Sequence, residues 1–137
     1  MNPKNYQVTR VIHFCYGHRL LNYAGKCRHP HGHNGVLEIT ISSSVLDSLG
    51  MVIDFDEIKK KIQAWVDAEL DHKMILNEKD PLVPVLQKMG DPVVLFPSNP
   101  TAENIAKYIF DYAKNQNLNV RSVKLWETQN SYAEYQP

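Results

Sequence analysis

The 137-residue chain lacks the features that mark several classes of protein. Its 15 basic and 15 acidic residues give a formal net charge of zero, and no basic stripe with interleaved aromatics indicates a nucleic-acid partner. No apolar run approaches the length of a membrane span, and residues 1–5 contain no apolar signal-peptide core. Repeats, low-complexity tracts and Ser/Gly linkers are absent, which favours a single domain over residues 1–137. We therefore expect a cytoplasmic protein whose partner is neither a membrane nor a nucleic acid.

Cysteine is scarce, since Cys15 and Cys27 are the only two in the chain. Two cysteines do not make the disulfide framework of a small secreted domain. A bond between them stays open as an alternative, but reduced thiols fit the expected compartment better.

Histidine, in contrast, is concentrated in one part of the chain, with five of the six histidines between positions 13 and 33. Imidazole and thiolate are the main protein ligands of zinc. Residues i and i+2 of a strand point to the same side, so His31 and His33 can share one metal ion if this segment is extended, and His18 adds a third nitrogen. Three protein ligands leave a fourth position open, as in a catalytic zinc site. A four-ligand structural site that includes Cys27 is the alternative.

Alternating apolar and polar residues predict several strands. The pattern indicates strands over residues 6–14, 33–45 and about 120–128, with an extension of the last over 132–135. The Gly/Pro-rich segment over 15–32 is predicted to be a loop, and its length suggests a functional one.

Apolar residues at helical spacing predict two helices. Asp54 begins the first, with Glu57 as its capping-box partner, and Thr101 is the N-cap of the second. The segment over 76–97 is predicted to be a proline-broken stretch around the short apolar run 93–96. Strands, then helices, then a strand indicate an α+β domain with its helices on one face of the sheet.

Six motifs, in this order along the chain, resemble the 6-pyruvoyl-tetrahydropterin synthase / 6-carboxy-tetrahydropterin synthase family. They are Phe14 to Leu20, Cys27 to His33, Gly50 to Phe55, Leu70 to His72, Pro100 to Asn104, and Glu127-Thr128. The resemblance extends from about residue 6 to residue 135 and implies the tunnelling fold (T-fold). In that fold each subunit contributes a four-stranded antiparallel sheet with two helices packed on one face. Subunits join edge to edge into barrels, commonly a homohexamer built as a dimer of trimers, which would also cover the open edges of the sheet.

The resemblance also implies a metal site. His18, His31 and His33 match the zinc ligands of the family, which makes Zn²⁺ the expected cofactor. His13 and His29 match no ligand position, and Pro30 disrupts a simple strand through residue 29. We expect both to be bystander histidines near the site.

The catalytic residues implied by the resemblance are Cys27, Asp71 and His72. A thiol near zinc has its thiolate favoured and can act as a general base, although a free cysteine is more often a small buried residue. A carboxylate beside an imidazole orients the ring and stabilises its charged form, although an aspartate after a helix is often only solvated. Cys15 has no counterpart in the family chemistry and is expected to be structural.

Glu127 matches the glutamate that anchors the pterin through the amidine-like N–H edge of the ring. It lies near the end of an otherwise apolar strand face, where an unpaired carboxylate is costly. Thr101 and Glu103 match a segment that approaches the pterin, but a helix N-cap and a first-turn acid explain them equally well. Asp54 also matches a family position, and we interpret it as a helix cap.

By resemblance the protein is a lyase that acts on 7,8-dihydroneopterin triphosphate, with zinc polarising the side-chain hydroxyl oxygens. The four-residue step from Cys27 to His31 resembles the bacterial carboxy branch. That branch releases triphosphate and acetaldehyde and forms 6-carboxy-5,6,7,8-tetrahydropterin, a queuosine precursor. The pyruvoyl branch, which stops after elimination and internal redox, and a non-catalytic zinc- or pterin-binding oligomer are the alternatives. Tyr16 and Gly17 stand where the family usually has small residues, which leaves the substrate preference open.

Overall fold

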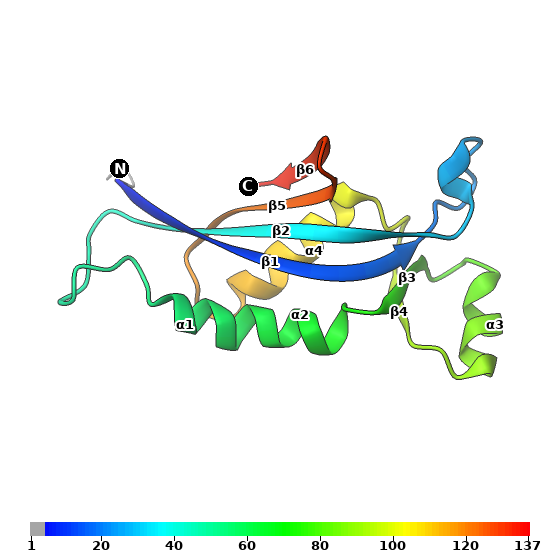
Figure 1. Ribbon diagram of the computed structural model, residues 1–137, viewed down its shortest axis with the longest axis horizontal. Helices are drawn as coiled ribbons and strands as arrows, with labels where there is room; N and C mark the ends of the chain where they lie inside the picture. Colours follow the sequence, from blue (N-terminus) through cyan, green and yellow to red (C-terminus); the bar gives the residue numbers. More distant parts are fainter. Residues whose placement is uncertain (1–4) are drawn as a thin grey trace.

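The computed structural model describes residues 5–137 as one sheet flanked by helices (Figure 1). Residues 1–4 of the expected domain, and with them most of the segment expected to lack a signal-peptide core, lie outside the described residues. The strands are β1 (Tyr6–His18), β2 (His31–Ser43), β3 (Lys73–Asn77), β4 (Val93–Phe96), β5 (Val120–Thr128) and β6 (Ser131–Tyr135). The helices are α1 (Phe55–Ile58), α2 (Ala64–Glu69), α3 (Leu82–Met89) and α4 (Ala102–Lys114). A π-helical turn, Lys59–Gln63, joins α1 to α2.

The six strands form one mixed sheet in the order β4-β3-β1-β2-β5-β6. β1 and β2 are antiparallel over their whole lengths, from Tyr6 opposite Ser43 to His18 opposite His31. β5 and β6 continue the antiparallel pairing beside β2. β3 is parallel to the end of β1 and to β4. The α+β class agrees with the sequence prediction, but the sheet has six strands rather than four and includes parallel pairs.

The additional strands are β3, just after the first helical region, and β4, in the segment over 76–97 that was expected to be a proline-broken stretch. Its apolar run 93–96 is strand β4, and helix α3 forms the crossover connection that a parallel pair requires. Pro81 is the N-cap of α3 and Pro84 lies in its first turn, where backbone N–H groups have no partner within the helix. Gly90 ends the helix with a φ of 83°. The prolines therefore help to begin this helix and do not interrupt it.

The structure confirms both predicted helix starts. The Asp54 carboxylate accepts a hydrogen bond from the Asp56 N–H at 2.9 Å, and the Thr101 hydroxyl accepts one from the Asn104 N–H at 3.1 Å. The capping box at the first helix is only half formed, because the Glu57 carboxylate pairs with Lys61 at 3.2 Å. No helix in the part of the chain that the structure describes is both long and apolar enough to cross a bilayer.

The core lies between the sheet and the helices α1, α2 and α4. Alternate residues of the two long strands and one face of each helix supply its buried side chains, which include Ile12, Phe14, Leu37, Ile39, Ile41, Ile58, Ile62, Val66, Ile105 and Ile109. Trp65 of α2 stacks on Tyr112 of α4 with ring centroids 3.8 Å apart and an interplanar angle of 7°. This contact holds the two helices together on the same face of the sheet.

Candidate functional site

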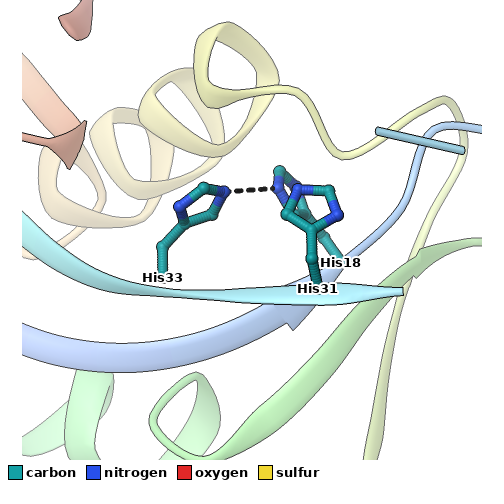
Figure 2. A group of neighbouring side chains, drawn as sticks. All are labelled: His18, His31 and His33. Atoms are coloured by element: carbon teal, nitrogen blue, oxygen red, sulfur yellow. Dashed lines mark hydrogen bonds between the residues drawn. The ribbon is translucent and has the colours of Figure 1, made fainter. Parts of the chain in front are cut away.

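Three histidines extend the core-facing sides of β1 and β2 to the end of the sheet (Figure 2). Because alternate residues of a strand share a face, the core-facing series of β1 ends in an imidazole, and that of β2 ends in two. These series are Ile12, Phe14, Tyr16 and His18 on β1, and Leu37, Gly35, His33 and His31 on β2. The same alternation that builds the core therefore gathers the three rings, and the first of them, His18, is only 3% exposed.

The ring nitrogens of the three histidines converge. Their candidate ligand atoms all lie within 4.8 Å of one another, and Nε2 of His18 is 3.1 Å from Nε2 of His33. Nδ1 of His18 lies 2.7 Å from the Pro100 carbonyl oxygen, and Nδ1 of His31 lies 2.7 Å from that of His29. A carbonyl oxygen only accepts, so each of these two Nδ1 atoms carries the proton. In the neutral ring Nε2 then keeps its lone pair for a metal.

A carboxylate from β5 points at the same nitrogens. Glu127 lies two residues beyond Leu125 on the buried face, and its Oε2 is 3.0 Å from Nε2 of His33 and 3.3 Å from Nε2 of His18. The adjacent imidazole of His18 lowers the pKa of Glu127 although burial acts in the opposite direction. Burial lowers the pKa of His33 and outweighs the attraction of the Glu127 charge. A carboxylate ion beside the neutral imidazole of His33 is a protonation pattern that suits a cation.

The histidine donors fit a zinc ion. With metal–nitrogen distances of about 2.0–2.1 Å, tetrahedral geometry places the nitrogens about 3.3 Å apart. The 3.1 Å between His18 and His33 is close to that separation. Two facing lone pairs repel, and a cation between them removes the repulsion. The structure thus brings together the expected ligands His18, His31 and His33, and the identity of the metal stays a prediction.

Asp71 and His72 form the expected carboxylate–imidazole pair. Oδ2 of Asp71 lies 2.7 Å from Nδ1 of His72, and Oδ1 accepts a hydrogen bond from the Cys15 N–H at 2.8 Å. The His72 N–H in turn donates to the Cys15 carbonyl at 2.7 Å, so both residues are fastened to β1. Burial opposes ionisation of Asp71, but the bonds from Cys15 and His72 prevail and lower its pKa. His72 has a φ of 60°, an uncommon conformation for a residue other than glycine.

An open cavity of about 410 Å³ adjoins the site. Its lining includes Cys15, Tyr16, Gly17, His31, His33, Asn34 and His72. The half-buried Cys15 thiol donates to Oδ1 of Asn34 at 3.0 Å, in agreement with a structural role. Cys15, Gly17 and Asn34 alternate along β1 and β2 with the histidines, so the cavity lies on the opposite face of the sheet from the three imidazoles.

The other residues expected at the site lie outside the lining of this cavity. Cys27 is exposed in a short 3₁₀ turn, Lys26–Arg28, within the loop that connects β1 to β2. The Thr101 hydroxyl caps α4, and Glu103 is exposed in the first turn of that helix. A single chain therefore brings together the three histidines and Glu127. His72 lies beside the cavity on the other face of the sheet, and Cys27 lies in the β1–β2 loop.

Sequence reasoning missed the groups that orient the histidines. Pro100 and His29 act through their carbonyl oxygens, which every residue has, so no side-chain pattern marks them. His29 is thus a bystander only as a side chain, while His13 is exposed on β1.

Tyr16, noted in the sequence as a departure from the family pattern, packs against the histidines. It is 3% exposed, and its ring centroid lies 5.3 Å from that of His18 and 5.6 Å from that of His33. Gly35 makes room for this ring, since a Cβ there would lie 3.0 Å from its Cε1. The Tyr16 hydroxyl is buried and finds no hydrogen-bond partner among residues 5–137.

Comparison with known proteins places the chain in a family. A sequence model described as 6-pyruvoyl tetrahydropterin synthase matches residues 7–137. The chain belongs to this family. It is 43% identical over 133 residues to the 6-carboxy-5,6,7,8-tetrahydropterin synthase of Rickettsia typhi, covering 92% of this chain and 96% of the relative. It is 33% identical to the enzyme of the same name from Haemophilus influenzae, with 96% and 99% of the two chains covered.

Two solved structures share the fold. The 6-pyruvoyl tetrahydropterin synthase of Caenorhabditis elegans matches with a TM-score of 0.72 and 26% identity, covering 96% of this chain and 95% of the other. An uncharacterized protein from Wolinella succinogenes matches with a TM-score of 0.83 and 25% identity, covering 96% and 97%. The tunnelling fold expected from the sequence is confirmed.

Proposed function

We propose that this member of the 6-pyruvoyl tetrahydropterin synthase family is a zinc-dependent 6-carboxy-5,6,7,8-tetrahydropterin synthase. The observation that carries the proposal is the convergence of the ring nitrogens of His18, His31 and His33. Relatives with 33% and 43% identity over nearly the whole chain bear this name. The proposed substrate is 7,8-dihydroneopterin triphosphate, which is converted with release of triphosphate and acetaldehyde. The product would enter queuosine (7-deazaguanine) biosynthesis in the cytoplasm.

The proposed chemistry divides proton transfer between two groups. His18, His31 and His33 would hold the zinc ion, which when bound would supply Lewis-acid polarisation of the hydroxyl oxygens on the substrate side chain. Cys27, as the thiolate, takes the proton from the side-chain carbon. His72, oriented by Asp71, transfers the partner proton as triphosphate leaves.

Substrate binding is assigned to the other polar residues of the motifs. Glu127, whose pKa is lowered, is an ionised acceptor for the N–H edge of the pterin. Thr101 and Glu103, in the segment that begins α4, are the weaker candidates, because the structure accounts for the Thr101 hydroxyl as a helix cap.

We also propose a homohexamer built as a dimer of trimers. Strands β4 and β6 are the two edges of the sheet, and an unpaired edge favours pairing with another chain. Cys27 is exposed, and the cavity that His72 lines is on the opposite face of the sheet from the imidazoles, which supports a site that draws residues from more than one subunit. Sedimentation equilibrium of the full chain should give about six times its 15.8 kDa mass. A monomer would contradict this assembly.

A second candidate function is 6-pyruvoyl tetrahydropterin synthesis. It is favoured by the 6-pyruvoyl tetrahydrobiopterin synthase of Dictyostelium discoideum, which is 32% identical over 113 residues and is covered over 73% of its length. Both reactions begin with loss of triphosphate, so the site geometry does not separate them, and the carbon product does.

The direct test is incubation of zinc-loaded protein with 7,8-dihydroneopterin triphosphate, followed by analysis of the products. Acetaldehyde and carboxy-tetrahydropterin are the expected products, and a pyruvoyl product would establish the second candidate. Binding of a pterin without turnover would refute the assignment as an enzyme.

The role of Cys27 has its own test. Cys27→Ala should abolish turnover while the zinc content stays near one ion per chain, because the proposed ligands are all histidines. Cys15→Ala is the matched control, since Cys15 is the other free thiol. A loss of zinc from Cys27→Ala would show that Cys27 is a metal ligand.

A further inference from the structure

We propose that Asn99 is a positioning residue for His18, through a side-chain clamp that holds the Pro100 carbonyl against the imidazole. The inference rests on the metal site of the proposed function but not on the reaction. It concerns a loop whose residues are not candidate ligands. The consequence is that metal affinity depends on a segment 82 positions away from His18 in the sequence.

The first step is the contact between His18 and Pro100. Nδ1 of His18 donates to the Pro100 carbonyl oxygen at 2.7 Å, and both residues are buried. This bond fixes the tautomer and the rotation of the ring, so it decides whether Nε2 faces His31 and His33. A fixed hydrogen-bond acceptor behind a ligating histidine commonly raises metal affinity by about 10–100-fold.

The second step is the clamp itself. Oδ1 of Asn99 accepts from the Leu21 N–H at 2.9 Å, and Nδ2 of Asn99 donates to the Leu21 carbonyl at 2.9 Å. The planar amide thus pairs with both polar groups of one backbone residue, as a neighbouring strand would. Leu21 lies three positions after His18, and Pro100 follows Asn99 directly. The clamp therefore joins the segment that carries the donor to the segment that carries the acceptor.

The side chains of Asn104 and Asn77 hold Asn99 in place. Nδ2 of Asn104 donates to the Asn99 carbonyl at 2.8 Å and to the Ser98 hydroxyl at 3.3 Å, and Nδ2 of Asn77 donates to Oδ1 of Asn99 at 3.3 Å. Residues 97–101 lie in neither a helix nor a strand, so side chains must provide the order that a backbone ladder would give.

A similar pair elsewhere in the chain separates positioning from general stabilisation. Nδ2 of Asn119 donates to the Ser42 carbonyl at 2.6 Å, and the Ser42 N–H donates to the Asn119 carbonyl at 3.1 Å. This contact joins β2 to the residue before β5, at the opposite end of β2 from His31 and His33. Asn119→Ala should lower the free energy of unfolding about as much as Asn99→Ala does. It should leave the positions of the histidine rings unchanged.

The experiment measures metal binding by the full-length protein. Zinc affinity is determined by competition with a chromophoric chelator, and ligand geometry is read from the visible absorption bands of the cobalt-loaded protein. Asn99→Ala should weaken zinc binding by about 10–100-fold and change the cobalt spectrum. Asn99→Asp retains the acceptor for the Leu21 N–H and loses the donor, so it should show a smaller loss. It also tests the proposal if the alanine variant does not fold.

The outcomes are distinguishable. Wild-type zinc affinity and an unchanged cobalt spectrum in folded Asn99→Ala or Asn99→Asp would overturn the proposal. An equal loss of affinity in Asn119→Ala would overturn it too, since global stability would then explain the effect. Failure of the wild-type protein to bind either metal would refute the metal site and the inference together. The expected Asn99 effect without turnover of 7,8-dihydroneopterin triphosphate would refute only the proposed function.

Discussion

Nε of Arg19 donates to Oδ2 of Asp80 at 2.7 Å, and a second guanidinium nitrogen contacts Oδ1 of the same carboxylate. The Asp80 side chain is completely buried, whereas that of Arg19 is 22% exposed. Oδ1 of Asp80 also accepts from the Leu82 N–H at 2.8 Å, at the first residue of α3. The residue that follows His18 is thereby fixed to the start of the crossover helix.

This pair predicts a pH-dependent contribution to stability. The hydrogen bonds from Arg19 outweigh burial and lower the pKa of Asp80. Because the folded-state pKa is below the unfolded value of about 3.9, the stabilisation is present above that value and is lost as the pH falls through the folded pKa. Asp80→Asn should reduce the free energy of unfolding at pH 7 by about 1.5–3 kcal/mol, the range for hydrogen bonds to charged groups.

Urea unfolding of the wild type and Asp80→Asn between pH 7 and pH 3 checks this prediction. The difference between them should shrink below about pH 4, where the Asp80 carboxylate of the unfolded wild-type chain becomes protonated while the folded one stays ionised. A difference that stays constant over this range would show that the charge of Asp80 does not stabilise the fold.

The backbone of His72 predicts a trade between stability and activity. Its φ of 60° costs a residue with a Cβ about 1–2 kcal/mol, which glycine avoids. The His72 side chain is 79% exposed, so its bond to Asp71 contributes little to folding. His72→Gly should therefore raise the free energy of unfolding by up to about 1 kcal/mol while turnover is lost. Thermal unfolding and the product assay test the two parts.

Asn117 supplies the control for His72. It has the same φ of 60°, but asparagine tolerates this conformation well, so Asn117→Gly should change stability less and leave turnover intact. If His72→Gly unfolds more easily than the wild type, the strain at this position is not the dominant effect.

The hydroxyl of Tyr16 predicts a stabilising substitution. Burial, followed by the charge of Glu127, raises the pKa of Tyr16 above its usual range, so the group stays a neutral phenol. A buried polar group without a partner costs about 1–3 kcal/mol, and Tyr16→Phe removes it with the ring in place. We expect a higher melting temperature and unchanged zinc affinity. The exposed Tyr132→Phe should change neither, and a loss of stability in Tyr16→Phe would reveal a hydrogen-bond partner in solution.

Gly35 predicts a packing conflict. A Cβ at this position would lie 3.0 Å from Cε1 of Tyr16 and 3.4 Å from Cδ1 of Leu125, so Gly35→Ala should cost about 1–3 kcal/mol. Gly32→Ala is the control on the same strand, since its Cβ would approach only the Tyr16 carbonyl, at 3.3 Å. In a double-mutant cycle with Tyr16→Leu, the cost of Gly35→Ala should fall. Additive effects would mean that the Tyr16 ring is not the source of the conflict.

Much of the fold could be predicted because a few local rules govern it. The alternation through Ile12 and Phe14 predicted strand β1, and side-chain chemistry located the caps at Asp54 and Thr101. The crossover unit over 73–96 was missed because its strands are short and because prolines in the first turn of α3 resemble a break. Short parallel strands show no alternation long enough to identify them.

The candidate site could be predicted only where side-chain type carries the signal. The three histidines and the Asp71–His72 pair are visible in the sequence because imidazole and carboxylate have distinctive chemistry. The Pro100 carbonyl and the Asn99 amide act through hydrogen bonds between residues 82 and 78 positions apart, and no spacing rule connects such distant segments. The orphan hydroxyl of Tyr16 likewise depends on three-dimensional packing.

Core residues and histidines occupy the same alternate positions of β1 and β2, and this limits where the chain tolerates insertions and deletions. One residue inserted between Phe14 and His18 would turn the imidazole to the opposite face of the sheet, while Ile12 and Phe14 kept their places. Two inserted residues would restore the face but displace the ring by about 6–7 Å along the strand. The number of residues between Phe14 in the core and the ligand His18 is therefore fixed. A relative whose alignment shows a gap in this interval should fold normally and bind no metal there.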